Sequence, residues 1–244
     1  MSIYLWGGGW SPAGDPDVVA PFLFEAAQRA AGSGRMIPRI GFLLVREDDP
    51  ESGYPTGFPA SFEAVAPCEP IVALLTVPGE GPSTFGSEVL NDIDALVIGG
   101  GMTPDYLAAV EPIMEEIRLL VADGLPYLGF SAGSMIAADR AVIGGYRIDG
   151  VQVCPEETGE DLEEVTIVEG LGLVDLAIDV HAAQWGTLGR LVAATEAGLV
   201  SGGVAIDEFT ALVVADDGLS VVGAGSVWRV LDDPAGVIVG ALAP

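Results

Sequence analysis

Residues 126–138 place the strongest constraint on what this chain can fold into. They contain Gly129-Phe-Ser131-Ala-Gly133, a Gly-x-Ser-x-Gly pattern, with a short apolar run before it and a run of small residues after it. Strand, tight turn and helix in this order are typical of a nucleophile elbow, where glycines let strand and helix approach and the serine hydroxyl is exposed. The same pattern also fits an ordinary glycine-rich strand-to-helix connection, so the rest of the chain must decide.

Apolar strand patterns alternate with helical patterns along most of the chain. This alternation predicts one α/β domain over residues 1–244, built as a three-layer, doubly wound, mostly parallel sheet. Strands are expected at 3–6, 39–45, 71–77, 94–98, 127–130 and 173–180, and helices at 18–31, 104–122, 132–138 and 184–197. Short patterns at 204–206, 210–214, 219–222 and 227–231 predict additional C-terminal β-strands. Ligands of such sheets lie at the carboxyl ends of the strands, where the elbow and the glycine loops at 7–9 and 99–101 would meet, with the polar loop 46–59 at the rim.

Composition excludes several classes of partner. The chain of 244 residues has 36 acidic against 9 basic residues and a net charge of −27, which disfavours nucleic acids and anionic membranes. The charge fits either a solvated acidic surface or the steering of cationic substrates. No apolar run is long enough to span a bilayer, and the first residues lack a basic segment, so a cytoplasmic protein is expected. Neither the two cysteines nor the acidic residues at 156–164 have metal-ligand spacing, so we expect no metal and no cofactor.

The choice of base for Ser131 is narrow, because a serine nucleophile needs a neighbouring base and the base needs an orienting acid. The chain has no lysine and a single histidine, His181, which ends an apolar strand 50 residues after Ser131. His181 is therefore the base, or it is a structural residue and the chemistry is different. Candidates for the acid are Asp139, Asp149, Asp179, Asp207 and Glu208. Asp179 would share a strand face with His181, which suits substrate binding better than orienting the imidazole.

Several motifs occur together and in order. They are Leu5-Trp-Gly-Gly-Gly9, Val97-Ile-Gly-Gly-Gly101, Gly-Phe-Ser131-Ala-Gly-Ser-Met-Ile-Ala, Asp179-Val-His181 with Gly189-Arg190-Leu191, and Ala205-Ile-Asp207-Glu208-Phe-Thr210-Ala211. Over nearly the whole chain this set resembles the peptidase E/cyanophycinase family of serine peptidases, which have the class I glutamine amidotransferase-like fold. True glutamine amidotransferases of this fold carry cysteine at the elbow, so Ser131 argues against their chemistry.

The resemblance implies a role for each matching position. Ser131 would be the nucleophile, His181 the base, and the amides of Gly100 and Ala132 the oxyanion hole. The acid would follow the elbow helix, where Asp149 lies 18 residues after the serine. Its neighbour Tyr146 stands where some members place the acid. The residues expected to bind substrate are Gly101, Met102, Asp179, Trp185 and Arg190.

Two departures bear on the substrate. Trp185 and Thr187 stand where cyanophycinases carry arginines, and Met102 replaces a glutamine, so cyanophycin itself is not the expected substrate. Selectivity for an aspartyl residue would need a cation, for which Arg140, Arg147 and Arg190 are candidates.

The predicted activity is a serine-type peptidase that cleaves a short peptide or isopeptide bond, an aspartyl bond among the candidates. It would act through a Ser-His-acid triad and an acyl-enzyme. The sequence does not decide the oligomeric state, and a homodimer is one candidate. The alternatives are an inactive member that binds a small ligand in the same crevice, and an α/β-hydrolase esterase, which the absence of a His-Gly-Gly-Gly motif disfavours.

Overall fold

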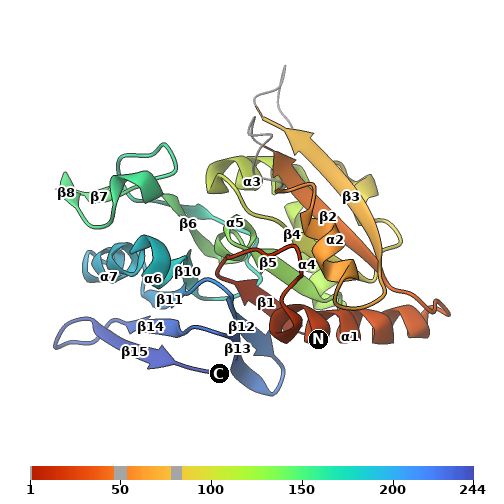
Figure 1. Ribbon diagram of the computed structural model, residues 1–244. Coiled ribbons are helices and arrows are strands. Elements are labelled where there is room, and N and C mark those ends of the chain that lie inside the picture. Colours follow the sequence, from red (N-terminus) through yellow and green to blue (C-terminus); the bar gives the residue numbers. More distant parts are fainter. Residues whose placement is uncertain (1, 47–53, 78–83) are drawn as a thin grey trace.

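A seven-stranded sheet runs through the centre of the part of the chain described by the computed structural model, residues 2–46, 54–77 and 84–244 (Figure 1). The strand order is β3-β2-β4-β5-β1-β12-β13, and the first five strands are parallel. β12 and β13 extend the sheet antiparallel beyond β1. The bounds are β1 Ser2–Trp6, β2 Arg39–Arg46, β3 Glu69–Thr76, β4 Ala95–Ile98, β5 Tyr127–Phe130, β12 Thr210–Ala215 and β13 Gly218–Gly223.

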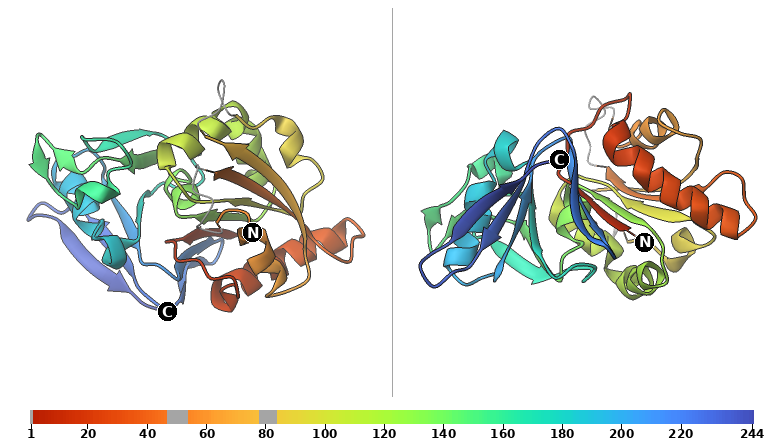
Figure 2. Two further views of the ribbon diagram at one scale, coloured as in Figure 1. Left: turned by 45° about the horizontal axis from the view of Figure 1, so that its top comes forward. Right: turned by 90° about the horizontal axis from the view of Figure 1, so that it is seen from below.

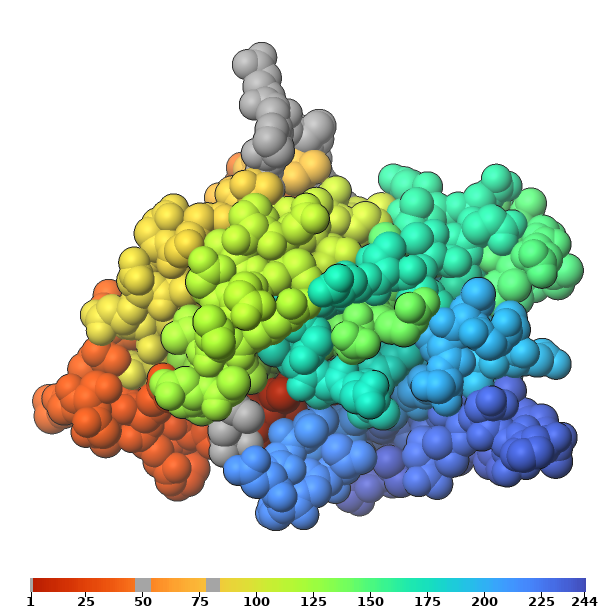
Figure 3. Space-filling model, turned by 180° about the vertical axis from the view of Figure 1, so that it is seen from behind, coloured from red at the N-terminus to blue at the C-terminus, as the bar shows by residue number. Residues whose placement is uncertain are grey.

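Helices cover both faces of this sheet, which is why its inner strands are apolar on both sides. Ile3 and Leu5 face one core, and Tyr4 and Trp6 face the other, as period-2 alternation requires. α1 (Pro16–Gly32) and α2 (Phe58–Glu63) lie on one side, and α3 (Thr103–Val110), α4 (Met114–Ala122) and α5 (Ala132–Met135) on the other (Figure 2, right). Seen from behind, the yellow-green segment of α3 and α4 forms a large part of the molecular surface on its side (Figure 3). The predicted three-layer fold is confirmed.

A second, four-stranded sheet stands beside the first, in the order β10-β11-β14-β15. Its strands are β10 (Ala177–Val180), β11 (Gly202–Ile206), β14 (Val227–Leu231) and β15 (Ile238–Leu242), and α6 (Ala182–Trp185) and α7 (Leu188–Glu196) follow β10. Its apolar residues Ile178, Val204 and Val227 belong to the same core cluster as Leu5 of the main sheet. The His181 N–H donates to the Gly7 carbonyl oxygen at 3.0 Å, so the carboxyl ends of β10 and β1 meet.

The elements differ from the predicted ones where glycine and proline intervene. The helix predicted at 104–122 is two helices, because a short 3-10 turn containing Pro112 separates them. The helix predicted at 184–197 is also divided, at Gly186 in the left-handed region. The strand predicted at 173–180 begins only at Ala177.

Several strands were not predicted at all. They are β15 and two small antiparallel pairs, β6 (Arg140–Gly144) with β9 (Thr166–Glu169) and β7 (Arg147–Ile148) with β8 (Val151–Gln152). Most of the predicted rim loop, 47–53, lies outside the described residues. In the described part of the chain no helix is both long and apolar enough to cross a bilayer.

Candidate active site

Ser131 occupies a strained turn between β5 and α5. Its backbone has φ 52° and ψ −110°, a combination that is costly for a residue with a Cβ and that concentrates at functional sites. The turn is possible because glycines flank it. A Cβ on Gly129 would lie 2.5 Å from the Gly133 backbone, and one on Gly133 would lie 2.2 Å from the Ile98 carbonyl oxygen. The elbow predicted from Gly-x-Ser-x-Gly is therefore present, and its glycines are steric requirements.

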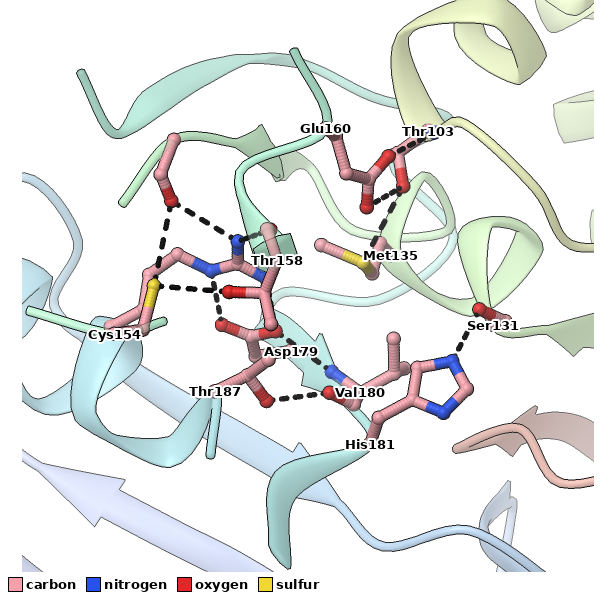
Figure 4. A network of polar contacts seen from close by, with 12 residues as sticks. Thr103, Ser131, Met135, Cys154, Thr158, Glu160, Asp179, Val180, His181 and Thr187 are labelled. Carbon is pink, nitrogen blue, oxygen red and sulfur yellow. Dashed lines mark hydrogen bonds and ion pairs between the residues drawn. The ribbon is translucent and has the colours of Figure 1, made fainter. Parts of the chain in front are cut away.

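The imidazole of His181 points at the serine hydroxyl. Ser131 Oγ and His181 Nε2 are 2.8 Å apart, and Figure 4 shows the ring turned towards Ser131. His181 lies just beyond β10 in the left-handed region, φ 55° and ψ 36°, so the alternation of the strand no longer applies to it. Asp179 and His181 consequently do not share a direction, contrary to expectation. Gly8 makes room for the ring, since a Cβ there would lie 2.0 Å from His181 Cε1.

The acid on the other side of the imidazole is Glu208. Its Oε1 lies 2.8 Å from His181 Nδ1, and the exposed fractions of the two side chains are 21% and 7%. The expectation that Asp149 fills this position is wrong, because Asp149 lies exposed in the turn between β7 and β8. Glu208 was among the candidates, and it reaches the site because β10 and β11 are parallel neighbours that end together, Val180 paired with Ile206. Gln184 Oε1 accepts a hydrogen bond from the Glu208 N–H at 3.0 Å.

Burial and charge act in opposite directions on His181. Burial lowers its pKa below the ordinary value of 6.5, whereas the hydrogen bond and charge of Glu208 raise it. The lowering keeps the imidazole neutral near pH 7, the state that can accept a proton. Trp185 stacks on the ring with 3.8 Å between centroids and an interplanar angle of 7°. An indole face stabilises a cationic ring, so this stack favours the imidazolium once it forms.

The expected oxyanion amides lie beside the serine. Ala132 is the first residue of α5, where a backbone N–H has no partner within the helix. Gly100 is pressed against Ser131, since a Cβ on it would lie 2.8 Å from Ser131 Cβ. The Gly100 N–H donates to the Tyr54 hydroxyl at 2.6 Å. An oxygen atom therefore already occupies the position in front of this amide, a contact that the sequence did not predict.

A cavity of about 260 Å³ opens beside Ser131 and His181. Of the expected substrate-binding residues, Gly101, Met102, Trp185 and Arg190 line it, together with Glu157, Thr158, Glu160, Val180 and Thr187.

Asp179 and Arg190 bind each other within the protein. Arg190 Nε and Nη2 donate to the two Asp179 oxygens at 2.8 and 2.7 Å. The Arg190 side chain is 2% exposed and that of Asp179 is 0% exposed. Arg190 Nη1 donates to the carbonyl oxygens of Thr158 and Gly145 at 2.7 and 3.2 Å. The guanidinium is thus committed to internal partners, and the geometry does not present it as an anchor for an aspartyl carboxylate.

Residues that the sequence did not single out also shape the site. Gly8, Tyr54 and Gln184 contact the reacting groups or the loop that carries Glu208, and Glu160 lines the cavity. Of these residues, only Gly8 had a signal in the sequence, because the glycine loop at 7–9 follows a predicted strand and so lies at the edge of the sheet where ligands bind.

Both cysteines are buried and unpaired, and among the described residues no three His, Cys, Asp or Glu side chains are grouped to hold a metal ion.

Three curated relatives match parts of this chain. A phosphoribosylformylglycinamidine synthase subunit PurQ from Methanopyrus kandleri is 45% identical over 23% of the chain, and a cyanophycinase from Trichormus variabilis is 35% identical over 48% of it. A peptidase E from Nostoc sp. is 29% identical over 38% of the chain. The matches cover 27%, 37% and 34% of those proteins, so the chain spans only about a third of their lengths.

The fold and the family rest on wider matches. The crystal structure of a peptidase from an acI-B1 Actinobacterium superposes with a TM-score of 0.60 at 18% identity, over 99% of this chain and 93% of that one. The likeness shows the fold, with which a glutamine amidotransferase-like arrangement is consistent. The model of peptidase family S51 matches residues 83–222, more than half of the chain and both Ser131 and His181. The resemblance to peptidase E and cyanophycinase is thereby confirmed, and the chain belongs to peptidase family S51.

Proposed function

We propose that this protein is a serine-type peptidase that hydrolyses a peptide or isopeptide bond through Ser131, His181 and Glu208. The observation that carries the proposal is the continuous chain of two 2.8 Å contacts, from Ser131 Oγ to His181 Nε2 and from His181 Nδ1 to Glu208 Oε1. A strained serine, a neutral base and an orienting carboxylate are the three parts of an activated serine nucleophile.

The contacts define the proton path. With Nδ1–H donating to Glu208, Nε2 carries a free lone pair and takes the hydroxyl proton as Ser131 Oγ attacks the substrate carbonyl carbon. Glu208 then faces the resulting imidazolium. The carbonyl π electrons move to the oxygen, and the oxyanion accepts hydrogen bonds from the amides of Ala132 and Gly100, the Tyr54 hydroxyl giving way to it.

Collapse of the tetrahedral intermediate re-forms the carbonyl and breaks the bond to nitrogen. His181 gives its proton to the departing amine, which leaves an acyl ester on Ser131. A water molecule then attacks this ester, His181 takes a proton from the water, and the same proton returns to Ser131 as the acid product leaves.

The inactive ligand-binding alternative is less well supported. The departures at Met102, Trp185 and Thr187 favour it, yet the reacting groups lie at hydrogen-bonding distance. The altered residues line the cavity or stack on the imidazole, where they would change which substrate is accepted.

The test is covalent labelling by a small fluorophosphonate, followed by intact-mass measurement. The wild type should gain one adduct with loss of fluoride, and Ser131→Ala and His181→Ala should gain none. Circular dichroism and thermal unfolding of each variant control for misfolding. An unlabelled wild type, or an adduct that persists in a folded Ser131→Ala variant, would overturn the proposal.

A further inference from the structure

Glu160 is a carboxylate within the cavity that contains the nucleophile. It lies just after the 3-10 turn at Glu156–Thr158, in the left-handed region at φ 55°, and its side chain lines the cavity together with Ser131 and Met102. Thr103 holds it from the start of α3: Thr103 Oγ1 donates to Glu160 Oε1 at 2.9 Å, and the Thr103 N–H donates to Oε2 (Figure 4). The carboxylate is thus fixed in place rather than free in solvent.

Glu160 has no countercharge of its own. Both groups on Thr103 are neutral donors, and the two oxygens of an ionised carboxylate can accept about four hydrogen bonds, so capacity remains. The cation among the described residues lining this cavity is Arg190, whose guanidinium already binds both oxygens of Asp179 and two carbonyl oxygens. Glu157, exposed at the same cavity, adds a second negative charge.

The surroundings of Glu160 resist its ionisation. Burial, the largest cause, and the charge of Asp179 raise its pKa, which is about 7 with all of its neighbours in place. The hydrogen bonds from Thr103 and the charge of Arg190 act in the other direction. The other titratable groups that line this cavity or the adjoining one are His181, Glu157, Asp161, Tyr146, Glu156 and Glu163. A cation entering the cavity would therefore stabilise the ionised carboxylate that the protein alone leaves uncompensated.

We propose that Glu160 determines specificity by binding the positively charged head of a long basic side chain, arginine or lysine, on the acyl side of the scissile bond. This inference rests on the proposed function, because the cavity selects a substrate only if Ser131 attacks one. The volume of about 260 Å³ lies just below the range of sites for drug-sized ligands and suits a single side chain. Met102 and Val180 offer apolar surface for its methylene stem, and Glu160 accepts hydrogen bonds from its end.

The net charge of −27 is consistent with this choice of substrate. A strongly negative protein attracts cationic peptides and raises their rate of encounter. An acidic side chain would instead be repelled by Glu157 and Glu160 in this cavity. Among the described residues that line the cavity, the cation Arg190 is already paired with Asp179.

The experiment compares an arginine substrate with its neutral isostere. N-acetyl-arginine and N-acetyl-citrulline carry the same fluorogenic amine as leaving group, and kcat/KM is measured for each. Protection of Ser131 against the fluorophosphonate by the two compounds gives a readout that does not depend on turnover. The wild type should prefer arginine by about ten- to hundredfold, the usual value of a charge-assisted hydrogen bond in a desolvated site. The preference should grow as the pH rises through about 7, where Glu160 ionises.

Two variants isolate the residue. Glu160→Gln keeps the size of the side chain and should reduce the preference to less than about threefold, mainly through KM. Glu196→Gln changes the net charge equally on the exposed surface of α7 and should behave as the wild type. If Glu160→Gln keeps the full preference for arginine, or if the wild type shows none, the specificity proposal is wrong.

A free α-amino group is the other source of positive charge, and a further pair of substrates tests it. Alanine amides with a free and an acetylated amino group carry the charge on the backbone instead of the side chain. Selectivity for the free amine that Glu160→Gln abolishes would overturn the side-chain assignment. Labelling of wild-type Ser131 by the fluorophosphonate separates the two proposals, because an adduct without arginine preference contradicts specificity alone, whereas the absence of any adduct contradicts the catalytic mechanism.

Discussion

Replacement of Glu208 by glutamine tests the most specific feature of the site, the carboxylate on His181. The change keeps the length of the side chain and the position of Oε1, 2.8 Å from Nδ1, but removes its charge. It also introduces an amide N–H₂ that can donate to Nδ1. That donation would place the imidazole proton on Nε2, where it blocks transfer from Ser131.

The expected loss follows from the geometry. An imidazolium and a carboxylate in contact at 2.8 Å have charge centres about 4 Å apart, which is worth about 4 kcal/mol at an effective dielectric constant of about 20. This dielectric suits a pair that is 7% and 21% exposed. Four kcal/mol corresponds to about a 10³-fold reduction in kcat, and the tautomer effect extends the expected range towards 10⁴.

The assay is the rate of fluorophosphonate labelling, or kcat/KM once a substrate is known, measured as a function of pH. In the wild type, activity falls as the pH decreases through the pKa of His181, since the protonated ring cannot act as a base. Glu208 raises that pKa, so its neutralisation should move the acidic limb to lower pH while lowering the plateau.

Asp149→Asn is the matched control. It removes an exposed carboxylate on the turn between β7 and β8, and we expect less than a twofold change in rate. If the rate of Glu208→Gln stays within tenfold of the wild-type rate, or if folded Asp149→Asn loses much of its rate, the assignment of the acid is refuted.

Three further predictions concern the support of the site. Gly8→Ala places a Cβ 2.0 Å from His181 Cε1, so labelling should fall at least about 100-fold; near-normal labelling of a folded variant would contradict the packing argument. Arg190→Met leaves Asp179 buried without its cation and should lower the free energy of unfolding by about 3–5 kcal/mol in urea titrations, a loss of under 1 kcal/mol being the contrary result. Glu160→Gln should be more stable than the wild type by up to about 3 kcal/mol at pH 8.5 and by under about 1 kcal/mol at pH 5. A raised carboxyl pKa costs stability that is complete above about pH 7 and disappears as the pH falls towards the unfolded value of 4.5, so a difference independent of pH would be inconsistent with burial of the charge.

The sequence alone predicted the elbow, the proposed base and the layered fold. Only small residues allow a strand and a helix to meet as closely as β5 and α5 do, so Gly129 and Gly133 indicate a tight turn at Ser131. The other motifs of the chain favoured a nucleophile elbow over an ordinary connection. The choice of His181 followed from composition, because no other histidine and no lysine exists in the chain. Two-sided apolar strands alternating with amphipathic helices likewise leave few arrangements other than a covered parallel sheet.

Tertiary structure alone decided what surrounds these residues. Glu208 could not be separated from Asp149 along the chain, because the choice depends on β10 and β11 being parallel neighbours in a second sheet. The pairing of Asp179 with Arg190 depends on α7 packing against β10, and the direction of His181 depends on the left-handed turn that ends the strand. Pattern and propensity act over a few neighbouring residues, whereas the partner of a buried charge is set by where distant segments pack.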